Sequence, residues 1–273
     1  MNHPDSPSRC IFVATHHKSG TVWMMTTFIR IAKKNGWDFI HLNEGESGWS
    51  LRPDKQQVFD NHIAQLNHDQ VAIFNDYHSD IPDLTRAKQS RRFRGVHIIR
   101  DPRDMLYSAV QFHLKANEPW LDEPDPGTGT TFRQRLRACP DLRSQIELEM
   151  DTHMGWTIEQ MANLDDQGVF INVPYEDLIT DTDMRQFHRV LVHLGLAGPE
   201  LINALDAYWA SSLFGERSDL DIEATRSHIN KSVPEQWRTE LPADCIDLIE
   251  ERYGWAIEKL GYPCSKAAEA PGS

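Results

Sequence analysis

Short apolar runs alternate with helical stretches along most of the chain. Five of these runs are rich in β-branched and aromatic residues and are bounded by polar or turn residues, which is typical of strands. Helical stretches lie between them, the first over residues 21–35. This alternation predicts an α/β fold with a central parallel sheet flanked by helices on both faces. The predicted strands are residues 10–15, 37–42, 71–76, 95–100 and 169–175.

The stretch after the fourth predicted strand has a different pattern. Residues 117–130, NEPWLDEPDPGTGT, are rich in Pro, Gly and Asp and predict a loop that is either a mobile tip or a functional lid. Residues 131–163 are predicted to be mostly helical. A closing amphipathic helix is expected within residues 242–263. Its apolar stripe is Ile246, Ile249, Tyr253, Ile257 and Leu260.

The length and composition fit one folded domain. The 273 residues include 40% apolar and 25% charged residues, which is ordinary for a globular protein. We expect a single domain over the whole chain, with flexible tails at residues 1–9 and 265–273. The net charge of −13 argues against nucleic-acid partners and against binding to anionic membranes. An anionic ligand must therefore be held by a few focused basic groups.

Neither cysteines nor histidines form a metal or disulfide pattern. The four cysteines are scattered without a C-x-x-C pair, and His16 and His17 lack a metal-ligand spacing. The start of the chain has no apolar signal segment, and no run of eighteen apolar residues predicts a membrane span. The simplest expectation is a metal-free protein of the reducing cytosol.

Residues 12–25, FVATHHKSGTVWMM, predict an anion-binding loop. A strand, a turn at Gly20 and a helix that starts near Thr21 would direct main-chain N–H groups at one point. Lys18 would add a positive charge, and Ser19 and Thr21 would add hydroxyl donors. A nucleotide P-loop has its Lys after the last Gly, whereas Lys18 comes before Gly20. The alternative is an ordinary strand-to-helix turn with a surface lysine.

A second basic element follows the fourth predicted strand. Residues 97–110 read HIIRDPRDMLYSAV, so Arg100 stands at a carboxyl strand end, where ligands of open α/β sheets bind. Ser108 lies eight residues later, within a predicted helix. An Arg fork and a hydroxyl suit a phosphate group. The alternative is that Arg100 pairs with Asp101 or Asp104 on the surface.

Together these segments resemble the sulfotransferase family. HHKSGTVW resembles the family's 5′-phosphosulfate loop, commonly Tyr-Pro-Lys-Ser-Gly-Thr-Thr-Trp, and RDPRDMLYS resembles its 3′-phosphate motif, Arg-Asn-Pro-Lys-Asp…Ser. VPYEDLITD, residues 173–181, resembles a family strand end, and HINKSVPEQW, residues 228–237, is a weaker match to the C-terminal Arg-Lys-Gly loop. The four matches occur in family order over most of the chain, which implies a P-loop NTPase-like sulfotransferase architecture.

The resemblance implies that the donor is 3′-phosphoadenosine 5′-phosphosulfate (PAPS). Lys18 and its loop would hold the 5′-phosphosulfate, and Arg100 with Ser108 would hold the 3′-phosphate. Trp23 would stack on the adenine, with helix-to-sheet packing as the alternative role, and Tyr175 would lie near the adenine. No metal is required for such binding. The implied nucleotide-binding residues are Lys18, Ser19, Gly20, Thr21, Val22, Trp23, Arg100, Ser108 and Tyr175.

His78 is the candidate catalytic base. It follows a predicted strand end and lies 22 residues before Arg100, the offset at which the family has a His that takes the acceptor proton. The family often has Lys two positions before this His, where this chain has Asp76. Asp76 is therefore a candidate to orient His78 or to raise its basicity. The alternative is a loop histidine without a role.

The C-terminal loop departs from the family's pattern. Asn230 stands where the family has Arg, and Asn cannot offer the guanidinium fork that binds a phosphate. We expect Arg226 and Lys231 to replace the missing charge around the 3′-phosphate. The alternative is that Arg226 pairs with a nearby carboxylate on the surface, where its removal would cost little.

The acceptor is expected to be a small molecule. Trp49, Trp120 and Phe112 are candidate pocket residues, and the predicted lid covers residues 113–130. Carboxylates in the same stretches would disfavour acidic acceptors, so a small neutral or lipophilic alcohol, phenol or amine fits best.

Two other functions compete with sulfuryl transfer. One is a small-molecule kinase that uses ATP and magnesium, and the other is a non-catalytic nucleotide-binding or scaffold protein of the same fold. The kinase would need a Gly-Lys-Ser/Thr order, which Lys18-Ser19-Gly20 reverses. No dimer motif is evident after the C-terminal loop, so the sequence predicts no oligomeric state.

Overall fold

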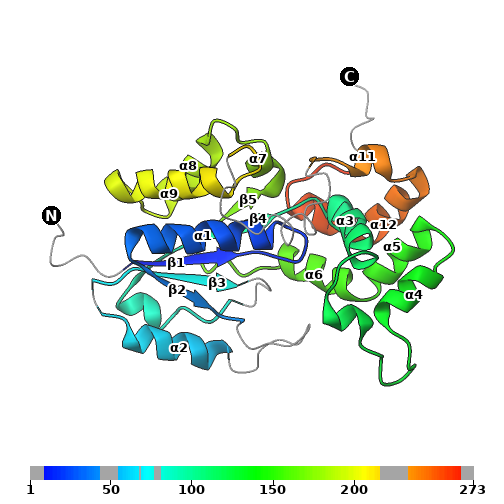
Figure 1. Cartoon of the computed structure of the whole chain (residues 1–273), viewed down its shortest axis with the longest axis horizontal. Helices are drawn as coiled ribbons and strands as arrows, with labels where there is room; N and C mark the ends of the chain where they lie inside the picture. The colour runs from blue at the N-terminus through cyan, green and yellow to red at the C-terminus, as the bar shows by residue number, and fades with distance from the viewer. Residues whose placement is uncertain (1–8, 44–54, 68, 77–80, 216–232, 266–273) are drawn as a thin grey trace. The chain divides into compact units, whose positions relative to one another are not determined.

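The computed structural model describes residues 9–43, 55–67, 69–76, 81–215 and 233–265. These residues contain a five-stranded sheet in which each pair of neighbouring strands is parallel, in the order β2-β3-β1-β4-β5 (Figure 1). All five strands predicted from the sequence are confirmed, with ends that differ by at most three residues. Their bounds are β1 Arg9–Ala14, β2 Asp38–His41, β3 Ala72–Asp76, β4 Arg92–Ile99 and β5 Phe170–Pro174.

The described residues divide into two compact units. Unit 1 lies within Met1–Ile99 and Leu164–Leu220 and contains the whole sheet, whereas unit 2 lies within Arg100–Asn163 and Asp221–Ser273 and is helical. The helices of unit 1 are α1 Thr21–Asn35, α2 Lys55–Gln65, α7 Tyr175–Ile179, α8 Arg185–His193 and α9 Gly198–Ser211, with a short 3-10 turn, η1, at Ala87–Gln89.

Each face of the sheet in unit 1 has its own apolar core. On one face, Ile11 and Val13 of β1 pack with Phe28 of α1 and with side chains of α8 and α9. On the other face, Phe12 of β1 packs with Phe59 of α2 and with aromatic residues of β3 and β4. Figure 1 shows α1 and α9 on one side of the sheet and α2 on the other. Helices therefore cover both faces, as the alternating pattern predicts.

Unit 2 contains the segments predicted to be mostly helical. Residues 131–163 form three helices, and the predicted closing helix runs over Ala243–Lys259. Within the predicted loop 117–130, the 3-10 turn η2, Pro119–Asp122, buries Leu121 completely. This part of the loop is therefore packed against the protein. The helices of unit 2 are α3 Pro102–His113, α4 Phe132–Ala138, α5 Leu142–Met150, α6 His153–Ala162, α11 Trp237–Glu240 and α12 Ala243–Lys259.

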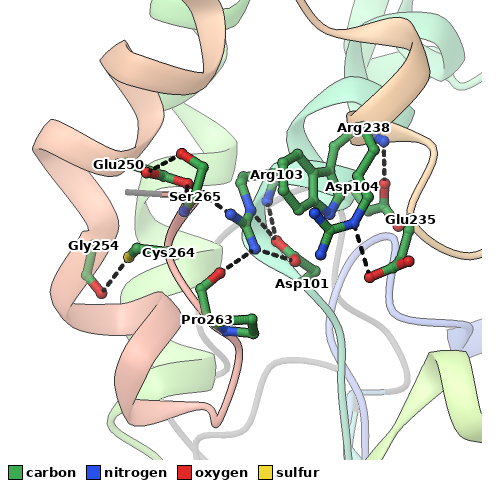
Figure 2. A network of polar contacts seen from close by, with 11 residues as sticks. Asp101, Arg103, Asp104, Glu235, Arg238, Glu250, Gly254, Pro263, Cys264 and Ser265 are labelled. Carbon is green, nitrogen blue, oxygen red and sulfur yellow. Dashed lines mark hydrogen bonds and ion pairs between the residues drawn. The ribbon is translucent and has the colours of Figure 1, made fainter. Parts of the chain in front are cut away.

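A buried ion network connects the start of α3 with α12 and the residues that follow it (Figure 2). The Arg103 guanidinium, which is fully buried, donates from Nη2 to Asp101 at 2.7 Å and from Nη1 to Glu250 of α12 at 2.6 Å. Nη2 also donates to the main-chain oxygen of Pro263 at 2.9 Å. The Arg103 guanidinium lies 3.6 Å from the ring centroid of Trp237. One arginine thus ties α3, α11 and α12 together.

Among the described residues, no helix is both long enough and apolar enough to cross a membrane.

Candidate functional site

The segment that joins β1 to α1 has the geometry of an anion-binding loop. The first main-chain hydrogen bond of α1 runs from Met24 N to Gly20 O, 3.0 Å, and no side chain caps the helix. The N–H groups of Thr21, Val22 and Trp23 therefore precede the first turn's bonds, at the positive end of the helix dipole. Such a terminus binds phosphate and sulfate groups.

His16 organises the loop through its main chain. Its carbonyl accepts from Ser19 N at 3.0 Å, from Ser19 Oγ at 3.0 Å and from Thr21 Oγ1 at 2.7 Å. Its N–H donates to Ser19 Oγ at 2.8 Å. In this structure the hydroxyl of Ser19, predicted as a ligand donor, both donates and accepts inside the loop. Ser19 is completely buried and therefore shapes the turn.

Two loop residues have left-handed backbone angles. Gly20 has φ 93°, and a Cβ atom there would lie 2.9 Å from Cδ2 of Tyr175, so only glycine fits. Lys18 has φ 68°, which is uncommon for a residue with a side chain. Strained backbone of this kind persists where the surrounding structure fixes it, and it is concentrated at binding sites.

Trp23 and Tyr175 lie beside the loop within unit 1. The Trp23 ring stacks on Tyr208 of α9 with centroids 5.6 Å apart and meets Tyr175 edge-on at 6.1 Å. Packing between helix and core is therefore one role of Trp23. Its indole Nε1 is buried and has no hydrogen-bond partner in the part of the chain that the structure describes. The predicted contacts of Trp23 and Tyr175 with adenine stay predictions.

His16 of the loop forms a buried pair with a histidine of the sheet. His16 Nε2 and His97 Nε2 of β4 are 2.8 Å apart, and His97 Nδ1 is 2.8 Å from Oδ1 of Asn172 of β5. Burial lowers the pKa of His97 to about 4, although the hydrogen bond to Asn172 opposes this shift. His97 is therefore neutral near pH 7. No sequence motif marks His97, and the signal that points to it is a histidine inside the apolar strand VHII.

Asp76 has a partner that the sequence did not predict. Its Oδ2 atom is 3.0 Å from Nζ of Lys55, the first residue of α2, and both side chains are almost fully buried. Asp76 ends β3, and its main-chain oxygen accepts from Thr15 N at the start of the loop. A lysine amine from α2 therefore lies at the carboxyl end of β3, where the resemblance places a lysine in the strand itself.

The Lys55–Asp76 pair predicts a large effect on stability. Breaking a buried pair from one side typically costs about 3–5 kcal/mol, because the remaining charge stays buried. We expect Lys55→Met to lower the free energy of unfolding by that amount in urea titrations. The double variant Lys55→Met/Asp76→Leu should recover most of the loss, because it removes both charges. A loss below about 1 kcal/mol in Lys55→Met would contradict a stabilising pair.

In unit 2, Arg100 and Ser108 are both buried, at 7% and 6% exposure. Asp104 lies close to them in sequence, and its Oδ1 accepts from the main-chain N of Trp237 at 2.8 Å. Burial raises the pKa of Asp104, and the positive charge of Arg100 opposes the rise. The neighbouring Asp101 caps α3 and binds Arg103. The first turn of α3 thus holds the start of α11, which follows the predicted C-terminal loop.

The predicted acceptor-pocket residues divide between described and undescribed parts of the chain. Phe112 and Trp120 lie in one buried cluster of unit 2 with Phe132. The Trp120 and Phe132 rings have centroids 5.7 Å apart. Contacts of Phe112 and Trp120 with an acceptor stay predictions. The predicted residues outside the described residues are His78, Trp49, Arg226 and Lys231.

Within the part of the chain that the structure describes, no three or more His, Cys, Asp or Glu side chains are grouped so that they could hold a metal ion.

Comparisons with known proteins agree on one family. A sequence model described as "Sulfotransferase domain" matches residues 8–261. Mouse sulfotransferase 2B1 is 26% identical over 204 residues, which are 73% of this chain and 54% of that protein. The chain thus spans about half the length of this curated relative.

Two solved structures share the fold. Mouse sulfotransferase SULT7A1 complexed with adenosine 3′,5′-bisphosphate (PAP) has a TM-score of 0.58 at 16% identity, over 93% of this chain and 85% of that one. Retinol dehydratase in complex with androsterone and inactive cofactor PAP has a TM-score of 0.56 at 14% identity, over 94% and 83%. Because the family match covers most of the chain, and the fold agrees with it, the chain belongs to the sulfotransferase domain family.

Proposed function

We propose that this chain transfers a sulfuryl group from PAPS to a hydroxyl or amine of a small acceptor and releases PAP. The observation that carries the proposal is the loop at residues 15–23, where an uncapped helix N-terminus meets Lys18 in a turn built around His16. The family match and the PAP-bound fold relatives support the choice of nucleotide. The reversed Lys-Ser-Gly order disfavours the kinase alternative.

In the proposed mechanism, the loop and the base have separate tasks: the loop stabilises the leaving group, and the base removes the proton of the acceptor. The acceptor oxygen attacks the sulfur in line while the bond from sulfur to the bridging phosphate oxygen breaks, as in phosphoryl transfer. Lys18 and the N–H groups at the start of α1 stabilise the negative charge that moves onto the leaving phosphate. His78 takes the acceptor proton as the new bond forms.

Other residues are proposed to bind the 3′-phosphate of the nucleotide and the acceptor molecule. In the proposal, Arg100 and Ser108 hold the 3′-phosphate, with Arg226 and Lys231 supplying the charge that Asn230 lacks. The acceptor is a small neutral or lipophilic alcohol, phenol or amine that contacts aromatic residues. The aromatic residues proposed for that contact are Trp49, Phe112 and Trp120.

Thermal unfolding with nucleotides tests the proposal. A ligand at about 100 times its Kd stabilises the native state by about 2.7 kcal/mol, which raises the Tm of a domain of this size by roughly 5–10 °C. We expect this shift with PAP in the absence of magnesium, and no comparable shift with ATP and magnesium. The reverse pattern would support the kinase, and no shift with either nucleotide would support a non-catalytic scaffold of the same fold.

A further inference from the structure

Three polar side chains form a continuous hydrogen-bonded chain across unit 1. His97 of β4 and Asn172 of β5 are register partners in the sheet, so their side chains share a face. His97 is also the register partner of Ala14, the last residue of β1, and His16 follows two positions later. The chain His16–His97–Asn172 therefore runs from the loop to the edge strand.

The direction of the hydrogen bonds follows from the protonation of His97. The Oδ1 atom of Asn172 can only accept, so Nδ1 of His97 carries the proton. Because the pKa of His97 is lowered to about 4, its ring is neutral near pH 7 and its Nε2 atom is an acceptor. His16 must then donate from Nε2 to Nε2 of His97 over the 2.8 Å distance. Asn172 thus sets the tautomer of His97, and His97 in turn holds the ring of His16.

His16 is also the residue on which the loop's main chain converges. Four hydrogen bonds connect its carbonyl and N–H to Ser19 and Thr21. Lys18, with its left-handed backbone, lies inside the turn that these bonds close. A shift of the His16 ring would therefore move the main chain of the turn and, with it, Lys18.

We propose that His97 is a positioning residue, which acts through His16 to keep the anion-binding loop in its ligand-ready shape. The sequence resemblance gives His97 no role. The proposal rests on the proposed function only for the identity of the anion, a phosphate or phosphosulfate on a nucleotide. A loop held in place before the ligand arrives binds more tightly, because less of the binding free energy goes into ordering it.

Two substitutions at the same position separate the two hydrogen bonds of His97. In His97→Gln, the side-chain oxygen can take the place of Nε2 and accept from His16. In His97→Asn, the shorter amide can reach Asn172 but not His16. When the loop occupies its native position in His97→Asn, the buried His16 N–H loses the acceptor that Nε2 of His97 provides, which disfavours that position. The apparent affinity for PAP then falls in proportion to the fraction of molecules whose loop keeps its native, binding-competent shape.

Calorimetric titration with PAP gives the first measurement. We expect His97→Asn to raise the Kd by about ten-fold or more and His97→Gln to stay within about three-fold of wild type. Asn172→Ala, at an exposed position, should fall between the two, because it frees the tautomer of His97 without removing the ring. It serves as the second test if His97→Asn does not fold. Wild-type affinity in both His97→Asn and Asn172→Ala, or equal losses in His97→Gln and His97→Asn, would overturn the proposal.

Hydrogen exchange of the loop gives a measurement that needs no nucleotide. The amides of His16 and Ser19 are hydrogen-bonded within the loop and should be protected in the wild type. We expect faster exchange at these amides in His97→Asn and wild-type exchange in His97→Gln, both at temperatures well below unfolding. Unchanged exchange in a folded His97→Asn would refute the positioning role. If exchange changes as expected but the wild type does not bind PAP, the proposed function fails while the positioning role holds.

Discussion

Lys18→Ala should reduce the turnover of PAPS by roughly 10²–10³-fold while the protein stays folded. The proposed role of Lys18 is to stabilise charge on the leaving phosphate, and removal of one such donor typically costs that much in rate. Steady-state assays with labelled PAPS and a panel of acceptors measure the loss. The exposed Lys33, in the last turn of α1, offers the matched control Lys33→Ala, which should leave the rate unchanged.

The backbone of Lys18 allows a second variant that separates chemistry from strain. Its φ of 68° favours glycine, so Lys18→Gly should relieve strain and leave Tm equal to or above that of the wild type. Its turnover should nevertheless fall as far as that of Lys18→Ala, because the amine is lost. Turnover within a few-fold of wild type in either variant would remove Lys18 from the mechanism.

His78→Ala should lower turnover by about 10²–10⁴-fold and leave the affinity for PAP unchanged. General-base catalysis is typically worth that much, and the base acts on the acceptor rather than on the nucleotide. Single-turnover rates and PAP titrations measure the two effects separately. His188→Ala, at an exposed position of α8, is the matched control and should match the wild type.

The opposite result would assign a different role to His78. If His78→Ala bound PAP much more weakly but still turned over, His78 would contact the nucleotide and the base would lie elsewhere. His17, next to Lys18 in the loop, would then be the residue to test first.

The framework of the fold could be predicted because its signals are local. All five strands are short apolar runs with polar ends, and α1 begins at Thr21 and ends at Asn35 as predicted. Gly20 and Gly36 frame this helix with left-handed backbone at both ends. The turn between β1 and α1 could also be located, because its residues are consecutive.

The side-chain partners within the candidate site could not be predicted, because they join residues far apart in sequence. Nothing in the local sequence marks Lys55 as a partner of Asp76, because the two residues are 21 positions apart and their side chains meet, at 3.0 Å, only in the fold. The role of Asp76 toward His78 stays a prediction. His97 contacts His16 across 81 residues and Asn172 across 75. Such pairs depend on strand order and register, which composition and spacing leave open. The hydrogen bonds of the Ser19 hydroxyl inside the loop are also not predictable from residue type, since a hydroxyl can bond either to a ligand or to nearby main-chain groups.

The order of strands in the sheet also determines when it can assemble during synthesis. β1 is the first of the five strands to be made but lies between β3 and β4, and Cys10–Ala14 are completely buried in the finished protein. At about 5–20 residues per second, the ribosome needs roughly 4–17 seconds to go from the end of β1 to the end of β4. During that interval at least one edge of β1 has no strand to pair with, and exposed apolar edges promote aggregation. The nascent chain is therefore most dependent on chaperone protection before β4 emerges, long before the later-made β5 completes the sheet.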